Sequence, residues 1–182
     1  MFDVERFVDD VKQANVQGHG AVADLLARSV SMPAEVLAGL GEPGAAGVHT
    51  LHRADNLTIL NIIWAPHMVL LPHNHNMWAA IGIYTGREDN ILWERQGERV
   101  QAVRATSLSE KDMFPLGKDG IHSVVNPAAR LTGAIHIYGG DFFDTTRSQW
   151  NPETLEEEPS DGARIREMFR RENERLGIDQ DS

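Results

Sequence analysis

The segment from residue 49 to residue 138 reads as a series of short strands without helices between them. Five stretches are rich in β-branched and aromatic residues, and these are 56–64, 78–84, 90–95, 99–106 and 131–138. Turn-forming sequences that contain glycine, proline or asparagine separate the stretches. Strands spaced in this way, without crossover helices, are typical of an antiparallel sandwich or barrel. The sequence therefore predicts a mainly β fold.

Helical periodicity is confined to the two ends of the chain. Apolar residues recur every three or four positions before the glycine- and proline-rich stretch 41–47, and they recur with the same period in 163–176. We therefore expect residues 1–182 to form a single domain. In this domain, residues 1–45 form a helical segment, 46–150 form the barrel, and 151–182 form a C-terminal extension with a helix.

Composition narrows the classes of function. The formal net charge of -10 would repel nucleic acid and anionic membranes, so we expect neither as a partner. The chain has no cysteine, which excludes disulfides, thiolate metal ligands and a cysteine nucleophile. Neither a signal peptide nor an apolar run of about 20 residues is present, so a cytoplasmic location is expected. Composition does not distinguish a monomer from a homodimer.

Two histidines, His73 and His75, stand two positions apart after a proline and before the apolar run 78–84. Residues i and i+2 of a strand point to the same face, so both imidazoles would be aimed at one point. A third histidine, His122, follows downstream. Three neutral imidazoles that meet in this way are suitable ligands for one divalent transition metal.

Two stretches of the sequence resemble the two motifs of cupins, which are small jelly-roll barrels that hold a metal at the mouth. The first stretch runs from Pro72 to Gly86, and the second runs from Pro115 to Asn126. The usual first motif places a glutamate four residues after its second histidine, where this chain has Ala79. The resemblance thus implies a cupin-type jelly-roll β-barrel, flanked by N-terminal helices and a C-terminal helix, with three histidine ligands and no carboxylate.

A three-histidine cupin resembles the thiol dioxygenases, the cysteine dioxygenase group. The segment from Ala134 to Tyr138 is similar to that family's Ser-x-His-x-Tyr segment, and Trp64 stands where the family carries tryptophan. The resemblance implies an Fe(II) enzyme that adds O2 to the sulfur of a small thiol and gives a sulfinic acid. It also implies catalytic roles for Tyr138, as a hydrogen-bond donor to bound oxygen, and for His136, which would hold the phenol. The same three ligands would also accept nickel or zinc.

The chain departs from the family pattern around this segment and at the position that binds the substrate carboxylate in the family. Ala134 replaces the serine, so a hydrogen-bond relay would end at His136, and Ala80 replaces the cysteine that is crosslinked to tyrosine in the animal enzymes. Leu51 aligns with the arginine that binds the substrate carboxylate, and Arg53 lies two residues away. This favours a thiol other than cysteine, including thiols without a carboxylate.

The expected substrate-contacting residues are Leu51 and Arg53, together with Trp64 and Trp78 as walls of the pocket. Two other classes of function remain open at this stage. One is a different three-histidine enzyme, such as a diketone dioxygenase or an isomerase, and oxygen uptake that depends on a thiol would distinguish it. The other is a cupin that binds a small ligand without catalysis, which a metal-free protein with an apolar pocket would favour.

Overall fold

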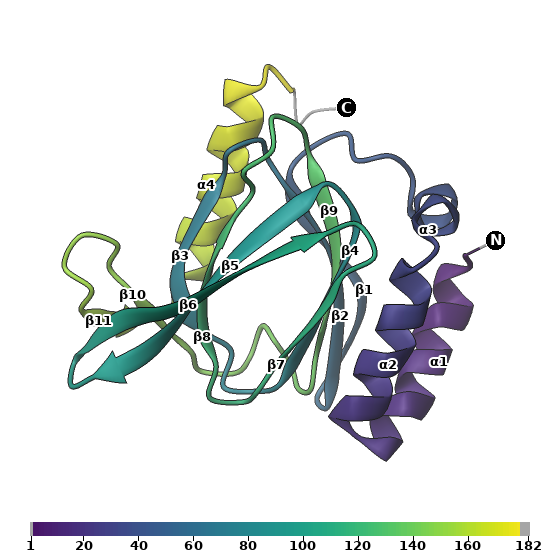
Figure 1. Cartoon of the computed structure of the whole chain (residues 1–182), viewed down its shortest axis with the longest axis horizontal. Helices are drawn as coiled ribbons and strands as arrows, with labels where there is room; N and C mark the ends of the chain where they lie inside the picture. The colour runs from purple at the N-terminus through teal and green to yellow at the C-terminus, as the bar shows by residue number, and fades with distance from the viewer. Residues whose placement is uncertain (1, 179–182) are drawn as a thin grey trace.

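The computed structural model describes residues 2–178 and shows a mainly β protein in which two antiparallel sheets face each other. Three N-terminal helices cover one sheet, and a C-terminal helix lies at the other side of the barrel (Figure 1). Within the described residues, no helix is both long enough and apolar enough to cross a membrane. The prediction of a mainly β fold is confirmed.

Within residues 2–178, the two sheets contain eleven strands. The five-stranded sheet has the order β1 (Gly47–Ala54), β2 (Leu57–Trp64), β9 (Thr132–Tyr138), β4 (Ala79–Thr85), β7 (Met113–Leu116). The six-stranded sheet has the order β11 (Glu157–Pro159), β10 (Ser148–Trp150), β3 (Val69–Asn74), β8 (Ile121–Val125), β5 (Arg87–Gln96), β6 (Arg99–Ser109). From β2 to β5 and again from β6 to β10, the chain alternates between the sheets. This alternation is that of a cupin-type jelly roll, although the two sheets do not close into a continuous barrel.

Helices α1 (Val4–Gln17), α2 (His19–Val30) and α3 (Pro33–Leu40) cover the outer face of the five-stranded sheet. Their buried apolar side chains form one cluster with outward-facing residues of β2, β4 and β9. A Cβ atom on Gly82 would lie 2.8 Å from a methyl group of Val30. A glycine at this position of β4 therefore lets α2 approach the sheet closely.

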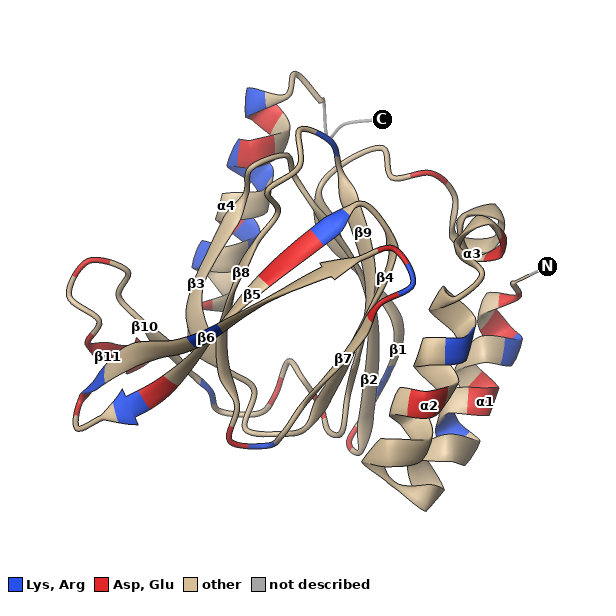
Figure 2. Ribbon diagram, in the orientation of Figure 1, with Lys and Arg blue, Asp and Glu red and all other residues tan. Residues whose placement is uncertain are grey.

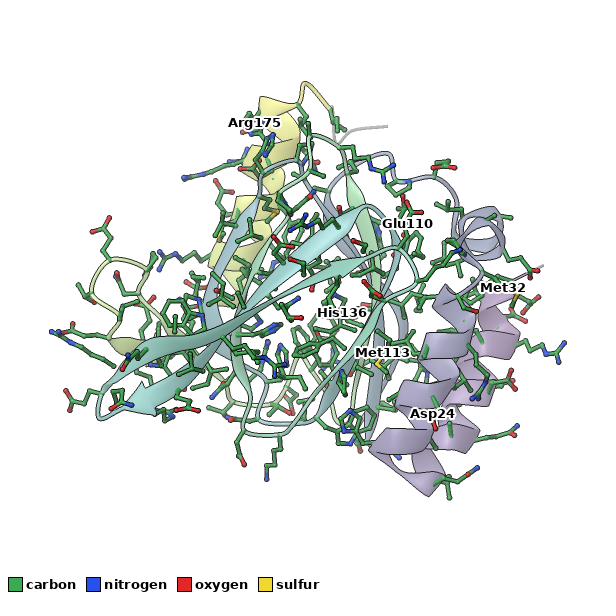
Figure 3. All side chains as sticks on the ribbon, viewed as in Figure 1. Asp24, Met32, Glu110, Met113, His136 and Arg175 are labelled. Atoms are coloured by element: carbon green, nitrogen blue, oxygen red, sulfur yellow. The ribbon has the colours of Figure 1, made fainter. Side chains whose placement is uncertain are left out.

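Strands β2, β4 and β9 are buried on both faces. None of them carries a charged residue, and Figure 2 shows the charges on the helices, the loops and the β5–β6 ribbon. On β9, Ile135 and Ile137 pack towards the helices, so the residues that alternate with them face the barrel interior. His136 and Tyr138 are thus inside the barrel, and Figure 3 shows His136 between the sheets.

Helix α4 (Gly162–Arg175) begins where the Asp161 side chain accepts hydrogen bonds from two backbone N–H groups. Phe169 stacks on the Trp64 ring at 5.5 Å, which attaches the helix to the barrel. The expected C-terminal helix is therefore present. The preceding strand β11 pairs with β10, which pairs with β3, so part of the predicted C-terminal extension belongs to the six-stranded sheet.

The buried Asn173 side chain of α4 also holds this helix in place. Its Oδ1 accepts a hydrogen bond from Ala46 N at 2.8 Å, and its Nδ2 donates to Ala46 O at 2.9 Å. We expect Asn173→Ala to lower the free energy of unfolding by about 2–4 kcal/mol, because two buried backbone groups lose their partners. Urea denaturation would measure the loss. Glu174→Ala, on the exposed side of α4, is the control and should cost less than about 1 kcal/mol. Similar small losses in both variants would contradict the anchoring role.

Candidate metal centre

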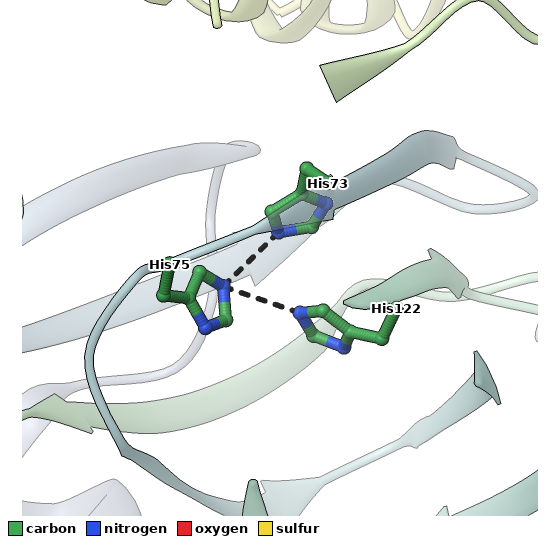
Figure 4. A group of neighbouring side chains, drawn as sticks. All are labelled: His73, His75 and His122. Carbon is green, nitrogen blue, oxygen red and sulfur yellow. Dashed lines mark hydrogen bonds between the residues drawn. The ribbon is translucent and has the colours of Figure 1, made fainter. Parts of the chain in front are cut away.

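The three histidines that were expected to share a metal converge in the barrel interior (Figure 4). His73 lies on β3 directly opposite His122 on β8, and His75 follows just after the end of β3. His75 Nε2 is 3.1 Å from His73 Nε2 and 3.2 Å from His122 Nε2. Strand pairing and the two-residue spacing together aim the same ring nitrogen of all three side chains at one point.

In His73 and His122, the hydrogen bond of the other ring nitrogen leaves Nε2 free to bind a metal, whereas the buried Nδ1 of His75 has no hydrogen-bond partner. His73 Nδ1 donates to Leu71 O at 3.0 Å, and His122 Nδ1 donates to Asn90 Oδ1 at 2.6 Å. Both Nε2 atoms therefore carry a lone pair rather than a proton. Burial lowers the pKa of His73 to about 4, and burial followed by the neighbouring imidazoles lowers the pKa of His75 and of His122 well below the ordinary value. All three rings are neutral at neutral pH.

The spacing of these nitrogens fits a bound metal ion. A metal with bonds of about 2.1 Å to imidazole separates neighbouring ligand nitrogens by about 3.0 Å in octahedral geometry and by about 3.4 Å in tetrahedral geometry. The observed distances of 3.1 and 3.2 Å fall between these limits. A single proton could bridge only one pair of nitrogens, whereas a cation can be shared by all three. Three imidazoles suit iron, nickel or zinc better than magnesium or calcium.

A cavity of about 400 Å³ opens over His73 and His122. Its walls are mostly apolar and include Ile62, Trp64, Leu70, Val124, Phe142 and Phe169. The polar residues of its lining are Thr50, His73, His122, His136, Tyr138, Arg147, Arg166 and Arg170. An apolar pocket with a few convergent polar groups is the usual form of a small-molecule site.

The two residues that were expected to be catalytic lie beside the histidines. The Tyr138 ring packs edge-on against His75, with centroids 4.9 Å apart, and its hydroxyl is 3.1 Å from His136 Nδ1. Burial raises the pKa of Tyr138, so the phenol remains protonated at neutral pH. His136 Nε2 lies 3.4 Å from Glu88 Oε2, an ion-pair distance rather than a good hydrogen bond. His136 Nε2 has no hydrogen-bond partner, so the chain of hydrogen bonds from Tyr138 ends at His136, as the sequence predicted, with the Glu88 carboxylate close by.

Glu88 is a functional candidate that the sequence analysis missed. Its side chain is fully buried and accepts hydrogen bonds from Trp64 Nε1 at 2.7 Å and from Asn90 Nδ2 at 2.9 Å. Burial alone would raise the pKa of Glu88, but the contacts with His136, Asn90 and Trp64 together lower it. The barrel thus contains an ionised carboxylate. Glu88 and Asn90 are two positions apart on β5, so both side chains point to the same face of the strand. This spacing is the sequence pattern that could have indicated them.

Arg147 is a second missed residue, and it belongs to the pocket itself. Its guanidinium lies over the Phe142 ring at 3.8 Å from the centroid, and its buried Nε has no hydrogen-bond partner. No carboxylate within residues 2–178 forms an ion pair with it. Burial lowers the pKa of Arg147, although an arginine in a protein keeps its charge. A cation of this kind, without a partner beside a metal centre, is suited to binding an anion.

Three of the four residues that were expected to contact substrate lie elsewhere. Arg53 forms an ion pair with Asp141 at 2.8 Å, outside the cavity lining. Leu51 packs against the cluster beneath the N-terminal helices, and Trp78 stacks on His19 with ring centroids 4.7 Å apart. Trp64 alone of the four lines the cavity.

No protein-family model matches this sequence, and the comparison with curated proteins gives no match either. Among solved structures, a protein with a double-stranded β-helix domain from Klebsiella pneumoniae aligns over 59% of this chain and 81% of its own, with 9% identity and a TM-score of 0.48. A cupin family protein from Methanocaldococcus jannaschii aligns over 57% and 87%, with 12% identity and a TM-score of 0.45. The DMSP lyase DddQ from Ruegeria pomeroyi aligns over 60% and 53%, with 15% identity and a TM-score of 0.48. Likenesses this distant do not bear on activity, and the strand order above identifies the fold.

Proposed function

We propose that this protein is an Fe(II)-dependent thiol dioxygenase. The observation that carries the proposal is the set of three neutral imidazoles whose Nε2 atoms converge at the cavity, with Tyr138 and His136 beside them. The reaction converts a thiol and O2 into a sulfinic acid. Two S–O bonds form, the O–O bond breaks, and the thiol proton is released to the acid product. Sulfur loses the four electrons that dioxygen takes up, so no other reductant is needed.

His73, His75 and His122 would hold the iron. When bound, the iron would supply open coordination positions for a thiolate and for dioxygen. Three neutral ligands leave the full charge of the ion at the site, which favours the thiolate over the thiol. The apolar walls around Trp64 and Phe142 exclude water from the reacting sulfur.

Arg147 supports a substrate that carries an anionic group. The expectation from Leu51 was that a carboxylate is dispensable, but Leu51 does not line the cavity, whereas Arg147 does. A thiol with a carboxylate would give this guanidinium the partner that it lacks. We therefore place 3-mercaptopropionate ahead of cysteamine as a test substrate.

Metal analysis and oxygen uptake together test the proposed function. Protein from iron-replete cells should contain close to one iron per chain and should consume oxygen only when a thiol is added. The sulfinic acid should appear by mass spectrometry with both oxygen atoms derived from labelled O2. An iron-loaded protein that consumes no oxygen with 3-mercaptopropionate, cysteine or cysteamine would overturn the proposal.

The size of the cavity favours a second candidate, another three-histidine enzyme that acts on a larger organic anion. About 400 Å³ is in the range of pockets for ligands larger than a three-carbon thiol. A diketone dioxygenase or an isomerase would fit such a pocket. Conversion of a bulky β-diketone by the metal-loaded protein in the absence of any thiol would favour this candidate.

The Tyr138 hydroxyl gives a prediction that is specific to the reaction. Tyr138→Phe keeps the ring against His75 and removes the hydroxyl that contacts His136. Losing one positioned polar group typically costs about 10²–10³ in rate. We expect a smaller fall in turnover, about tenfold to hundredfold, since a bound metal provides part of the charge stabilisation. Iron content and kcat would be measured on the same preparation. Full activity with intact iron would show that Tyr138 only packs.

A further inference from the structure

Glu88 lies where two chains of hydrogen-bonded side chains meet. We propose that its carboxylate is a positioning group, which fixes the proton of His122 on Nδ1 and thereby makes Nε2 a metal ligand. The inference rests on the proposed metal centre but concerns residues on β5, a strand that contributes no ligand. It links Glu88 to His122 through Asn90.

The first step is the orientation of the Asn90 amide. An ionised carboxylate can only accept hydrogen bonds, so the group facing it must be a donor. The amide nitrogen of Asn90 is 2.9 Å from Glu88 Oε1. Both side chains are fully buried, at 0% exposure, so bulk solvent does not reach either of them. The Asn90 oxygen must therefore point away from Glu88.

The second step is the tautomer of His122. The Asn90 oxygen lies 2.6 Å from His122 Nδ1, and an oxygen acceptor requires a proton on that nitrogen. The proton is then absent from Nε2, which faces the other two histidines. An outer partner that orients a metal-binding histidine in this way typically strengthens metal binding by 10- to 100-fold.

The other contacts of Glu88 keep the carboxylate in place. Trp64 Nε1 donates to Oε2 at 2.7 Å, and His136 Nε2 lies 3.4 Å from the same oxygen. The two carboxylate oxygens thus have different partners. Oε2 faces Trp64 and His136, and Oε1 faces Asn90, so the chain towards His122 depends on Oε1 alone.

Glu88→Gln keeps the contact with Trp64 and changes the contact with Asn90. The indole N–H of Trp64 retains the remaining side-chain oxygen, so the new NH2 group faces Asn90. The Asn90 amide must then turn, its NH2 group faces His122 Nδ1, and the proton of His122 moves to Nε2. We expect the affinity of the apoprotein for Co(II) to fall about 10- to 100-fold, as measured by titration of its visible absorption.

A second substitution should reverse this loss. In the double variant Glu88→Gln, Asn90→Asp, the new amide donates to the new carboxylate at position 90, and this carboxylate accepts the proton of His122 Nδ1. The net charge of the pair is the same as in the natural protein. Affinity for Co(II) should return to within a few-fold of the original value. A residue needed only for packing or for charge at position 88 would not allow this rescue.

The tautomer itself can be read without metal. Nitrogen-15 NMR of the metal-free protein should show His122 protonated on Nδ1 in the natural chain and in the double variant, but on Nε2 in Glu88→Gln. Unchanged Co(II) affinity together with an unchanged tautomer in Glu88→Gln would overturn the inference. The inference would also be overturned if the double variant did not show both the Co(II) affinity and the Nδ1-protonated His122 of the natural protein. This comparison can be made even if the single variant does not fold. A natural protein that binds no metal would instead refute the proposed function, while the tautomer would still test Glu88.

Discussion

His122→Ala is expected to abolish metal binding and, with it, oxygen uptake. Two histidines would remain, and the third position would be a space left by a side chain with only 1% exposure, with no ligand atom in it. A ligand present at 100 times its dissociation constant stabilises a folded protein by about 2.7 kcal/mol. For a domain of this size, that is roughly a 5–10 °C rise in melting temperature when metal is added. The natural protein should show this rise, and the variant should not.

The control for this experiment is a histidine outside the site. His67 is exposed and has a positive φ of 62°, a backbone conformation that asparagine tolerates well. His67→Asn should therefore retain both the metal and the metal-dependent rise in melting temperature. If His122→Ala bound metal as tightly as His67→Asn does, the three-histidine site would be refuted.

The histidine site and the barrel could be predicted because each depends on a local pattern. The spacing of His73 and His75 brings their rings together even though His75 lies just beyond the end of β3. The strands β2, β4 and β9 are covered on both faces and therefore read as continuous apolar runs. Such patterns are visible in a single sequence, because residues a few positions apart determine them.

The residues that were missed depend on contacts between distant parts of the chain. Trp64 and Glu88 are 24 positions apart, and they meet because the two sheets pack face to face. Arg147 lies between β9 and β10, in an irregular stretch without periodicity. No local pattern indicates that its side chain turns into the cavity rather than into solvent.

The placement of Leu51 fails for a different physical reason. The pairing of β1 with β2 shifts its register between Thr50 and His52, so Leu51 is the extra residue of a β-bulge. A bulge changes the face to which the following side chains point. Leu51 accordingly packs towards the N-terminal helices, and Arg53 reaches Asp141. An alignment that assumes regular strand alternation cannot place this segment.

Arg147→Met should separate substrate recognition from stability. Removing one partner of a desolvated charge pair usually costs 2–5 kcal/mol of binding, so we expect kcat/KM for 3-mercaptopropionate to fall about 10²-fold or more. The kcat/KM for the uncharged thiol 2-mercaptoethanol should change only a few-fold. Methionine retains packing against Phe142 and removes a half-buried charge that has no partner within residues 2–178. The free energy of unfolding should therefore stay equal or rise, which denaturation would show.

The same substitution at Arg53 is the matched control, because Arg53 also lies near a phenylalanine ring but pairs with Asp141 outside the cavity. Arg53→Met should leave kcat/KM for both thiols nearly unchanged and should cost at most about 1 kcal/mol of stability, as expected for a surface ion pair. If preference for the carboxylate survived in Arg147→Met and disappeared in Arg53→Met, the anion would bind at the rim of the barrel and not beside the metal centre. A carboxylate held by Arg147 would lie in the same cavity as His73 and His122, and this proximity would bring the sulfur of a short thiol to the metal.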